Sequence, residues 1–380
     1  MNGSRQATDP ASLGRHFGGK QDVLPLWIAE PYVDLAPSVV TALNDRAAEG
    51  WYGYETRPGE LISTFWTWMI DRHGWDGTGL TSLISPSVGT SLGVLIDQMT
   101  DAGDGVILQP PVFTDFKPII TSSGRAVARN PLVMTDAGYR MDLEELAVQA
   151  ADPKNTAMIL CNPHNPVGRV WTPAELNAVA AICAEHGVFV IADEIHADLV
   201  LPDNTFTPFG NAAAGTGVVW AATHGPIKTF GLAGVCDTVV ITDDETVATR
   251  FQLRSSQLHL TRNNVFGLAA WDAAYRDGAP WLDDLLALIA SNTALLANGL
   301  PTGIELVEPE GTYLAWLDLR QLGMEVPELA QWLALSAGLA LSPGHWFGRE
   351  GAGFARMTIA VPPDRIREAI HRLTVAVTAG

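Results

Sequence analysis

The stretch TAMILCNPHNPVGRVWTPAELNAVAAICAEHGVFVIADEIH, residues 156–196, decides the fold class. It contains two short runs, 156–161 and 188–192, that are apolar throughout rather than alternating, as strands buried on both faces are. Between them, residues 172–186 begin with a Thr-Pro-x-Glu start signal and are followed by a glycine, which predicts a helix. Strand, helix and strand in this order are typical of a parallel sheet covered by helices.

The same rhythm continues on both sides of this stretch. Further apolar runs predict strands, and amphipathic segments between them predict helices. We therefore expect an α/β fold with a mainly parallel sheet that has helices on both faces. The additional strands are predicted at 82–85, 105–109, 218–222 and 238–242, and the additional helices at 92–101 and 142–150.

The pattern changes after about residue 270, where a smaller α+β domain is expected. It opens with one long amphipathic helix at 281–300 and continues with strands at 312–317 and 355–361 and helices at 327–337 and 363–377. The predicted organisation has three parts: 1–40, a segment that joins the small domain; 41–270, the large domain; and 271–380, the long helix and the small domain.

Composition narrows the class of protein. The 380 residues are 47% hydrophobic and 17% charged, which excludes disorder, and the net charge of −19 disfavours nucleic acid and membrane surfaces as partners. No apolar run reaches membrane-spanning length, and the N-terminus lacks the apolar core of a signal peptide. Three cysteines without CxxC spacing predict a reducing, cytoplasmic location, and the scattered histidines indicate no metal site.

Lysine is scarce, with four in the chain: Lys20, Lys117, Lys154 and Lys228. The first three lie in polar contexts. Lys228 lies in a glycine-rich stretch with few charges, between two apolar runs. A desolvated lysine is what Schiff-base chemistry needs, because burial lowers the pKa of the amine. Lys228 is therefore the favoured reactive amine.

Ligands of parallel sheets bind where the strands end, so the residues after each predicted strand are the candidate site. A Ser-Pro-Ser-Val-Gly loop precedes a helix and could hold a phosphate through its amides. Asp193 ends an apolar run and needs a cationic or hydrogen-bonding partner. Together with Phe113, Asn165 and Lys228, these groups match the needs of pyridoxal phosphate: a lysine for the aldehyde, an aromatic ring for stacking and a carboxylate for the pyridine nitrogen.

Seven stretches carry a resemblance to a known family: LPLWIAE (24–30), GWYGYETRP (50–58), GDGVILQPPVF (103–113), NPHNPVGRVW (162–171), DEIHADLV (193–200), IKTFGLAG (227–234) and SPGHWFGREGAGFARMTIA (342–360). The chain resembles fold-type I pyridoxal-phosphate enzymes of the class I/II aminotransferase superfamily, and within them the cystathionine β-lyase (C–S lyase) branch. The resemblance runs from about residue 24 to the C-terminus. Its most specific parts are the fourth and fifth stretches.

The resemblance implies a role for each matching residue. Lys228 holds the cofactor and moves the substrate Cα proton, and Arg356 binds the substrate carboxylate. The remaining residues bind the cofactor: Asp193 at the pyridine nitrogen, Asn165 and His196 near the ring hydroxyl, Phe113 on the ring face, and Ser87, Val88 and Gly89 at the phosphate. Tyr54 reaches the phosphate of the neighbouring subunit, so the resemblance implies a homodimer with its active site at the subunit interface.

The chain departs from the family pattern at several positions. Residues 224–227 read His-Gly-Pro-Ile where the family usually offers serine or threonine to the phosphate, and Cys236 replaces an arginine that aminotransferases use there. Phe113 lacks the hydroxyl of the usual tyrosine, and Glu30 replaces an aspartate. These departures bear on cofactor affinity and substrate choice.

Three alternatives to a lyase remain open at this point. A pyridoxal-phosphate aminotransferase shares nearly all of these motifs, although His196 and its context favour the lyase. A serine hydrolase is suggested by Gly89-Thr90-Ser91-Leu92-Gly93, which fits the G-x-S-x-G nucleophile motif but leaves Lys228 and Arg356 unexplained. The altered loop at 224–227 also allows a protein that has kept the fold and lost catalysis.

Overall fold

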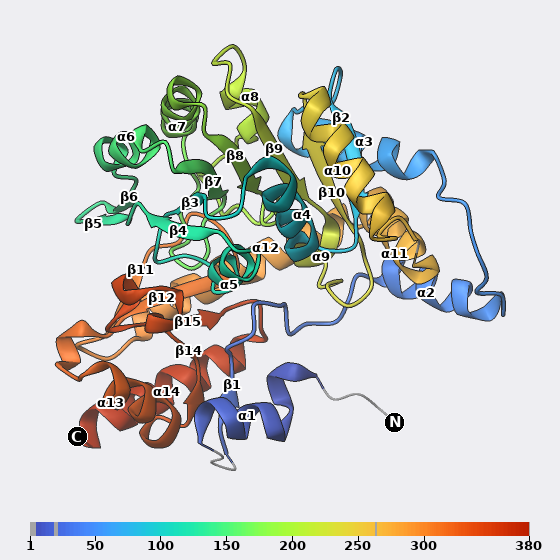
Figure 1. The fold of residues 1–380 in the computed structure, drawn as a ribbon. Coiled ribbons are helices and arrows are strands. Elements are labelled where there is room, and N and C mark those ends of the chain that lie inside the picture. Colours follow the sequence, from blue (N-terminus) through green and yellow to red (C-terminus); the bar gives the residue numbers. More distant parts are fainter. Residues whose placement is uncertain (1–4, 19–21, 263, 380) are drawn as a thin grey trace.

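The computed structural model describes residues 5–18, 22–262 and 264–379; Lys20 lies outside the described residues. A seven-stranded sheet forms the centre of the larger part (Figure 1). Among the described residues, no helix is long and apolar enough to cross a bilayer.

The strands of the seven-stranded sheet, in spatial order, are β2 (Thr81–Ser85), β10 (Thr238–Thr242), β9 (Trp220–His224), β8 (Phe189–Asp193), β7 (Asn155–Cys161), β3 (Gly105–Leu108) and β4 (Ala126–Arg129).

Strand direction decides which loops meet. β9, β8, β7, β3 and β4 pair in parallel, whereas β10 runs antiparallel to both of its neighbours, β9 and β2. β2 therefore points the same way as the parallel strands. The mainly parallel α/β sheet predicted from the sequence is confirmed, and the carboxyl ends of β2, β3, β7, β8 and β9 lie at one edge of it.

Helices cover both faces of this sheet (Figure 1). In β8, Phe189 and Ile191 belong to one hydrophobic cluster, whereas Val190 and Ala192 belong to the other. This explains why the strand sequences are apolar throughout. One face carries α4 (Val88–Met99), α5 (Phe116–Ser122) and α10 (Glu245–Gln257), and the opposite face carries α6 (Leu143–Ala151), α7 (Pro173–His186) and α8 (Phe209–Ala213).

The signals that predicted α7 act as expected. The Thr172 hydroxyl accepts a hydrogen bond from the Glu175 amide at 3.2 Å, and the Glu175 carboxylate accepts one from the Thr172 amide at 2.9 Å. Gly187 ends the helix with φ of 69°, a left-handed conformation that favours glycine. These local contacts fix the crossover between β7 and β8.

The smaller part has a separate four-stranded antiparallel sheet in the order β11 (Glu305–Val307), β12 (Leu314–Asp318), β15 (Phe354–Thr358) and β14 (Ser342–Pro343). The long helix α12 (Ala279–Gly299) leads into it, and α14 (Pro363–Ala379) packs against α12. The single helix predicted at 327–337 is wrong in detail. It is α13 (Val326–Gln331) followed by a π-helical turn at Trp332–Ser336, which shifts the hydrogen bonds by one residue.

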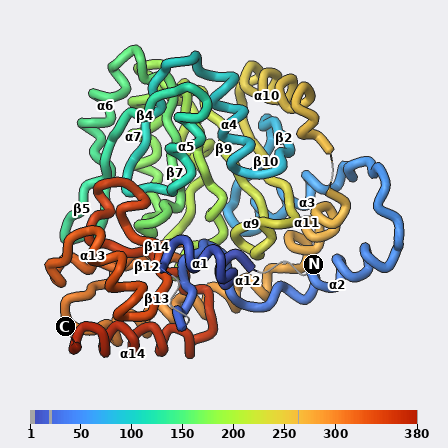
Figure 2. The backbone as a smooth tube through the Cα atoms, turned by 60° about the horizontal axis from the view of Figure 1, so that its bottom comes forward, coloured from blue at the N-terminus to red at the C-terminus, as the bar shows by residue number. Residues whose placement is uncertain are grey.

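The N-terminal segment lies against this smaller sheet. It contains α1 (Pro10–Phe17) and β1 (Leu24–Pro25), and β1 pairs in parallel with β13 (Leu339–Ala340). The Phe17 ring packs edge-on against Trp27 at 5.4 Å, in an aromatic cluster that also includes Trp346. Figure 2 shows α1 beside the smaller part of the chain.

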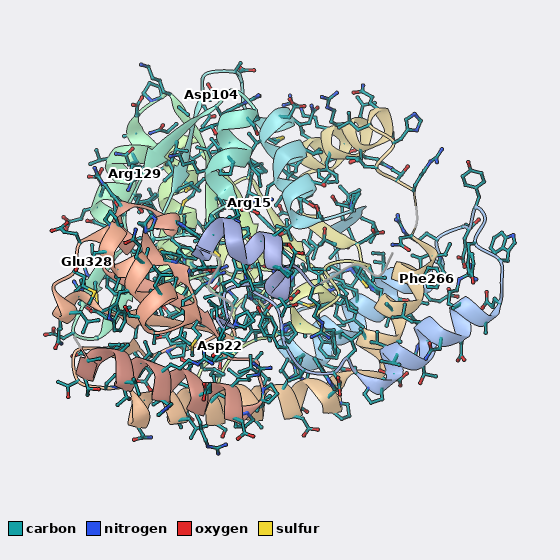
Figure 3. All side chains as sticks on the ribbon, turned by 90° about the horizontal axis from the view of Figure 1, so that it is seen from below. Arg15, Asp22, Asp104, Arg129, Phe266 and Glu328 are labelled. Carbon is teal, nitrogen blue, oxygen red and sulfur yellow. The ribbon has the colours of Figure 1, made fainter. Side chains whose placement is uncertain are left out.

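Several elements have no counterpart among the predictions. An exposed segment at 49–59 joins α2 to α3 and stands out from the body near Phe266, which is labelled in Figure 3. A small hairpin follows β4. Elements not yet introduced that the sequence did not predict are α2 (Pro37–Ala48), α3 (Glu60–His73), β5 (Val133–Thr135), β6 (Gly138–Arg140), α9 (Pro226–Thr229) and α11 (Val265–Asp277); α1, β1, α5, β4, α8, α10, β11, β13 and β14 were not predicted either.

Candidate active site

Lys228 lies at the sheet edge where the five strand ends meet. β9 continues to His224, two residues beyond the predicted strand, so the lysine stands on the short helix α9 rather than in an open loop. Its Nζ donates a hydrogen bond to the Ala29 carbonyl oxygen at 2.9 Å. Burial, helped by the positive charge of Arg356, lowers the pKa of Lys228 to about 8. The amine is therefore easily deprotonated near neutral pH.

Asp193 is the last residue of β8 and is 4% exposed. Its Oδ1 accepts hydrogen bonds from the Thr223 hydroxyl at 3.2 Å and the Ile195 amide at 3.3 Å. Burial raises the pKa of this carboxyl to about 6, against the opposing effects of these hydrogen bonds and of Lys228. The buried carboxylate expected from the sequence has no ion-pair partner of its own within the described chain, and so would be stabilised by a cationic ligand.

Asn165 and Arg356 meet directly, although Asn165 lies in the turn after β7 of the large sheet and Arg356 on β15 of the small sheet. Arg356 Nη1 donates to Asn165 Oδ1 at 3.1 Å, while Nη2 donates to the Trp27 carbonyl at 2.9 Å and lies 3.3 Å from Ser342 Oγ. The guanidinium is 6% exposed and lies over the Phe347 ring, and burial lowers its pKa to about 10. Over the described ranges, the guanidinium is therefore held by neutral groups alone. Its Nε–H has no hydrogen-bond partner among the described residues and remains available to donate.

His196 completes this group. It is 3% exposed and packs edge-on against Tyr313, with ring centroids 5.8 Å apart. Burial, together with the charges of Lys228 and Arg356, holds the pKa of His196 well below its ordinary value, so the ring is neutral at pH 7. Within the described part of the chain its Nδ1 has no partner. An unpaired buried ring nitrogen is the kind of group that a ligand would satisfy.

A candidate phosphate cradle lies at the start of α4. The helix begins at Val88, four residues before the predicted start, so Val88 and Gly89 form its first turn. Ser87 caps it in extended conformation, and its hydroxyl accepts from the Thr90 amide at 3.1 Å. The unpaired amides and dipole of this first turn suit an anion.

The same turn contradicts the serine-hydrolase alternative. Ser91 is fully buried, and its hydroxyl donates to the Ser87 carbonyl at 3.0 Å. It also lies 3.5 Å from Thr238 Oγ1, inside the contact between α4 and β10. A nucleophile must be exposed beside a base, so the G-x-S-x-G pattern at 89–93 is a packing feature here.

His224 differs from its expected place in the loop before the lysine. It ends β9, is 2% exposed, and its Nε2 lies 2.8 Å from Glu194 Oε2. The other oxygen of Glu194 accepts from the Phe209 amide at 2.7 Å. This buried pair ties the end of β9 to the loop after β8, so His224 serves the scaffold rather than a phosphate. Cys236 is also buried, with its thiol 3.5 Å from the Gly267 carbonyl.

The two remaining predicted residues lie further out. Phe113 follows β3, is half-buried and packs edge-on against Phe116 at 5.4 Å. Tyr54 is 84% exposed on the segment 49–59, with Arg262 5.5 Å above its ring. Tyr54 is thus not brought to the group around Lys228 by its own chain.

Sequence reasoning missed three groups that shape the site. The Ala29 carbonyl contacts both Lys228 and Tyr313, whose hydroxyl donates to it at 3.0 Å. Asp198 anchors the lysine helix: the Thr229 hydroxyl and the Trp68 indole N–H each donate to it at 2.8 Å, and His73 Nε2 lies at the same distance. Ala29 and Asp198 lie within the LPLWIAE and DEIHADLV stretches, so those motifs were visible although their contacts were not, whereas Tyr313 lies outside all seven stretches. No cluster of three or more metal-ligating side chains occurs among the described residues.

Comparison with known proteins places this geometry in a family. The aminotransferase class I and II family model matches residues 21–373. Cystathionine β-lyase PatB of Bacillus subtilis is 34% identical over 95% of this chain and 94% of its own length, and protein MalY of Escherichia coli is 31% identical over 95% and 93%. The structure of cystalysin from Treponema denticola, which contains a pyridoxal 5′-phosphate cofactor, superposes with a TM-score of 0.87 at 28% identity, over 95% of this chain and 92% of that one. The chain belongs to the class I and II aminotransferase family.

Proposed function

We propose that this protein is a pyridoxal-phosphate-dependent carbon–sulfur β-lyase. It would release pyruvate, ammonia and a thiol from an L-amino acid that carries sulfur at Cβ. The observation that carries the proposal is the position of Lys228, a half-buried amine of lowered pKa, in the electrostatic field of both Asp193 and Arg356. The similarity to cystathionine β-lyase PatB, and His196 where many aminotransferases have a tyrosine, favour elimination over amino transfer.

The residues present fit the cofactor. Asp193 offers a buried acceptor to the pyridine nitrogen, Asn165 and His196 offer polar groups to the ring hydroxyl, and Phe113 offers a ring face. Ser87 and the first-turn amides of Val88 and Gly89 would hold the phosphate. The unpaired Nδ1 of His196 supports this assignment, because the site leaves a buried nitrogen for a ligand to satisfy. When bound, the cofactor accepts the electron pair released at the substrate Cα and so labilises the Cα proton and the Cβ substituent.

Arg356 would bind the substrate carboxylate. Its two terminal nitrogens form a planar fork that matches a carboxylate, and they now bond to the neutral acceptors Asn165 and Trp27. Because no anion pairs with this guanidinium in the described chain, a substrate carboxylate would supply the missing charge. The side chain would thereby fix the amino acid in one orientation.

Lys228 would carry the proton. A base must be neutral to take a proton from Cα, and the burial that lowers its pKa to about 8 supplies that form near neutral pH. The Ala29 carbonyl would hold the amine while it is free of the cofactor, because Nζ already donates to that oxygen. The protonated lysine could then return its proton within the same site.

We also propose a homodimer in which Tyr54 completes the partner's phosphate site. This is supported by the exposure of three aromatic rings on one projecting segment: Trp51, Tyr52 and Tyr54 are 53%, 54% and 84% exposed. Exposed aromatic side chains gathered in this way are typical of an interface. A cytoplasmic location is proposed as well, and the three cysteines, all free and buried, support it.

Incubation with L-cystathionine and with S-alkyl cysteines tests the activity. We expect pyruvate and free thiol in equal amounts, without added 2-oxo acid. Turnover that depends on a 2-oxo acid and yields no thiol would replace the lyase by the aminotransferase. If the protein binds pyridoxal phosphate but converts neither L-cystathionine nor S-alkyl cysteines by either reaction, the alternative of a protein that has kept the fold and lost catalysis would replace the lyase.

A further inference from the structure

One carbonyl oxygen near Lys228 has two donors. The Ala29 carbonyl accepts from Lys228 Nζ at 2.9 Å and from the Tyr313 hydroxyl at 3.0 Å. Tyr313 is fully buried, and burial raises its pKa, so the hydroxyl remains a proton donor. A carbonyl oxygen has two lone pairs, and here both are used. The phenol therefore shares its only described partner with the reactive amine.

The residue before Tyr313 is strained. Thr312 has φ of 67° and is fully buried. A β-branched residue rarely adopts this left-handed conformation, which costs about 1–3 kcal/mol and persists only where its surroundings impose it. Its amide donates to the Leu199 carbonyl at 2.6 Å, and its hydroxyl accepts from the Leu314 amide at 3.1 Å. Strain of this kind concentrates at functional sites.

Gly311 explains how the strained turn is held. A Cβ at this position would lie 2.7 Å from Val170 Cγ2 and 2.9 Å from the Leu199 carbonyl, so only glycine fits. Its amide donates to the Gly168 carbonyl at 2.9 Å. The turn at 311–313 is thus wedged between the loop that carries Asn165 and the loop that carries His196. This placement leaves the Tyr313 hydroxyl little freedom to leave Ala29.

We propose that Tyr313 is a positioning residue for Lys228: by bonding to the Ala29 carbonyl it fixes that acceptor and competes for it, so that the lysine is presented as a neutral amine. Two donors on one oxygen weaken each other, and the ammonium form, which needs the stronger acceptor, loses more than the amine. The inference rests on the proposed function, because it assigns Lys228 as the reactive amine.

Other charges also act on Lys228, and the test leaves them in place. Arg356 of β15 opposes the ammonium form, whereas Asp193 of β8, Glu30 of the N-terminal segment and Asp115 after β3 favour it. His196, packed on Tyr313, is neutral at pH 7. Tyr313→Phe removes one hydroxyl without changing any formal charge.

The experiment uses full-length protein from which the cofactor has been removed. The rate at which Lys228 captures added pyridoxal phosphate is measured from pH 6 to 10, by the visible absorbance of the lysine-bound cofactor. In Tyr313→Phe we expect the midpoint of this profile to move to higher pH. Capture at pH 7 should fall about threefold to tenfold, as expected for a pKa rise of half a unit to one unit, and should approach the parent rate near pH 10. The matched control is Tyr139→Phe, another buried phenol, whose oxygen accepts from the Trp316 indole at 3.3 Å; its profile should match the parent.

Each outcome decides the inference. If the Tyr313→Phe profile superposes on the parent, or the variant loses only thermal stability, the positioning role is overturned. If Tyr313→Phe does not fold, Thr312→Gly replaces it, since a relaxed turn should loosen the hydroxyl and give a smaller shift in the same direction; superposition there also overturns the proposal. If the parent captures no cofactor, or Lys228→Ala captures it equally well, the proposed function itself fails.

Discussion

The two ends of the proposed site are built differently. At the reaction end, Lys228, Asn165 and Arg356 are joined to their neighbours by hydrogen bonds that one chain supplies, and all come from the core of the molecule. At the phosphate end, the described chain offers the first turn of α4 and the Ser87 cap, while residues 224–227 read His-Gly-Pro-Ile, without serine or threonine, and position 236 is a cysteine. The aromatic residue expected to help, Tyr54, is 84% exposed on the segment 49–59.

This difference suggests a division of labour. A single chain folds the groups that touch reacting atoms, because they must be buried and held within a few tenths of an ångström. The groups that merely retain the cofactor would tolerate a looser arrangement, and in the proposed homodimer a second copy would supply one of them. Variants at the reaction end should therefore affect the rate, whereas variants at the phosphate end should affect cofactor retention.

Lys228→Ala should have the largest effect. Removing the proposed proton carrier should lower pyruvate formation by about 10³-fold or more, because general acid–base catalysis and the covalent anchor are lost together. Steady-state assays with L-cystathionine measure this. Lys154→Ala, at an exposed turn, is the matched control and should retain full activity; equal losses in both variants would contradict the assignment.

Arg356→Lys should come next. The charge remains but the planar fork is lost, which should cost about 2 kcal/mol of transition-state binding, or roughly 30-fold in kcat/KM. Arg356→Ala should cost more and reduce the preference for an amino acid over its amide. Arg349→Ala removes an arginine that is 81% exposed and should change little. A change within about threefold in Arg356→Ala would show that another group binds the carboxylate.

Asp193→Asn should separate stability from function. Folding raises the pKa of Asp193 from its ordinary value of 3.8 to about 6. Ionisation of this carboxyl therefore opposes folding, with the full cost above about pH 6 and none below about pH 4. Without cofactor, the variant should therefore gain up to about 3 kcal/mol of unfolding free energy at pH 7.5, and less at pH 5.

Urea unfolding of the cofactor-free protein at both pH values measures this gain. Exposed Asp136→Asn is the control and should show no such pH dependence. With cofactor bound, the parent should be more stable than Asp193→Asn, because the ionised carboxylate would then face the pyridine nitrogen. A variant that is destabilised at both pH values without cofactor would contradict the assigned cost.

Tyr54→Phe should have the smallest effect, confined to the phosphate end. Loss of one hydrogen bond should weaken cofactor binding about fivefold, with kcat at saturating cofactor nearly unchanged. Tyr52→Phe is the matched control, because the Tyr52 hydroxyl donates to Ala47 of its own chain at 2.6 Å. Equal cofactor affinity in Tyr54→Phe and the parent, or a fully loaded monomer in solution, would contradict the shared site.

Local signals made much of the fold predictable. The cap at Thr172, the glycine after α7 and the apolar runs of β7 and β8 act within a few residues, so the sequence alone indicates them. The strand-end rule then brought Asp193, Asn165 and Lys228 to one edge. Lys228 could be chosen among four lysines because its neighbours are apolar.

Contacts between distant segments were beyond this reasoning. Tyr313 donates to Ala29 across 284 positions, and no periodicity links the two. The sequence placed His224 in a loop because Thr223 and His224, which extend β9, are polar, as turn residues usually are. The structure shows instead that His224 is a strand residue paired with the buried Glu194. The π-helical turn at Trp332–Ser336 and the early start of α4 likewise depend on packing, which overrides helix propensity.

The contact between Lys228 and Ala29 has a consequence for how the chain matures. It spans 199 positions, and the Asn165–Arg356 bond spans 191, so each contact requires a long loop to close. Until then, the lysine is hydrated and keeps the ordinary lysine pKa of 10.5. In a half-folded chain, where β15 and the N-terminal segment have not docked, this lysine would therefore remain an ordinary ammonium group, and the lowered pKa of Lys228 belongs to the completed fold.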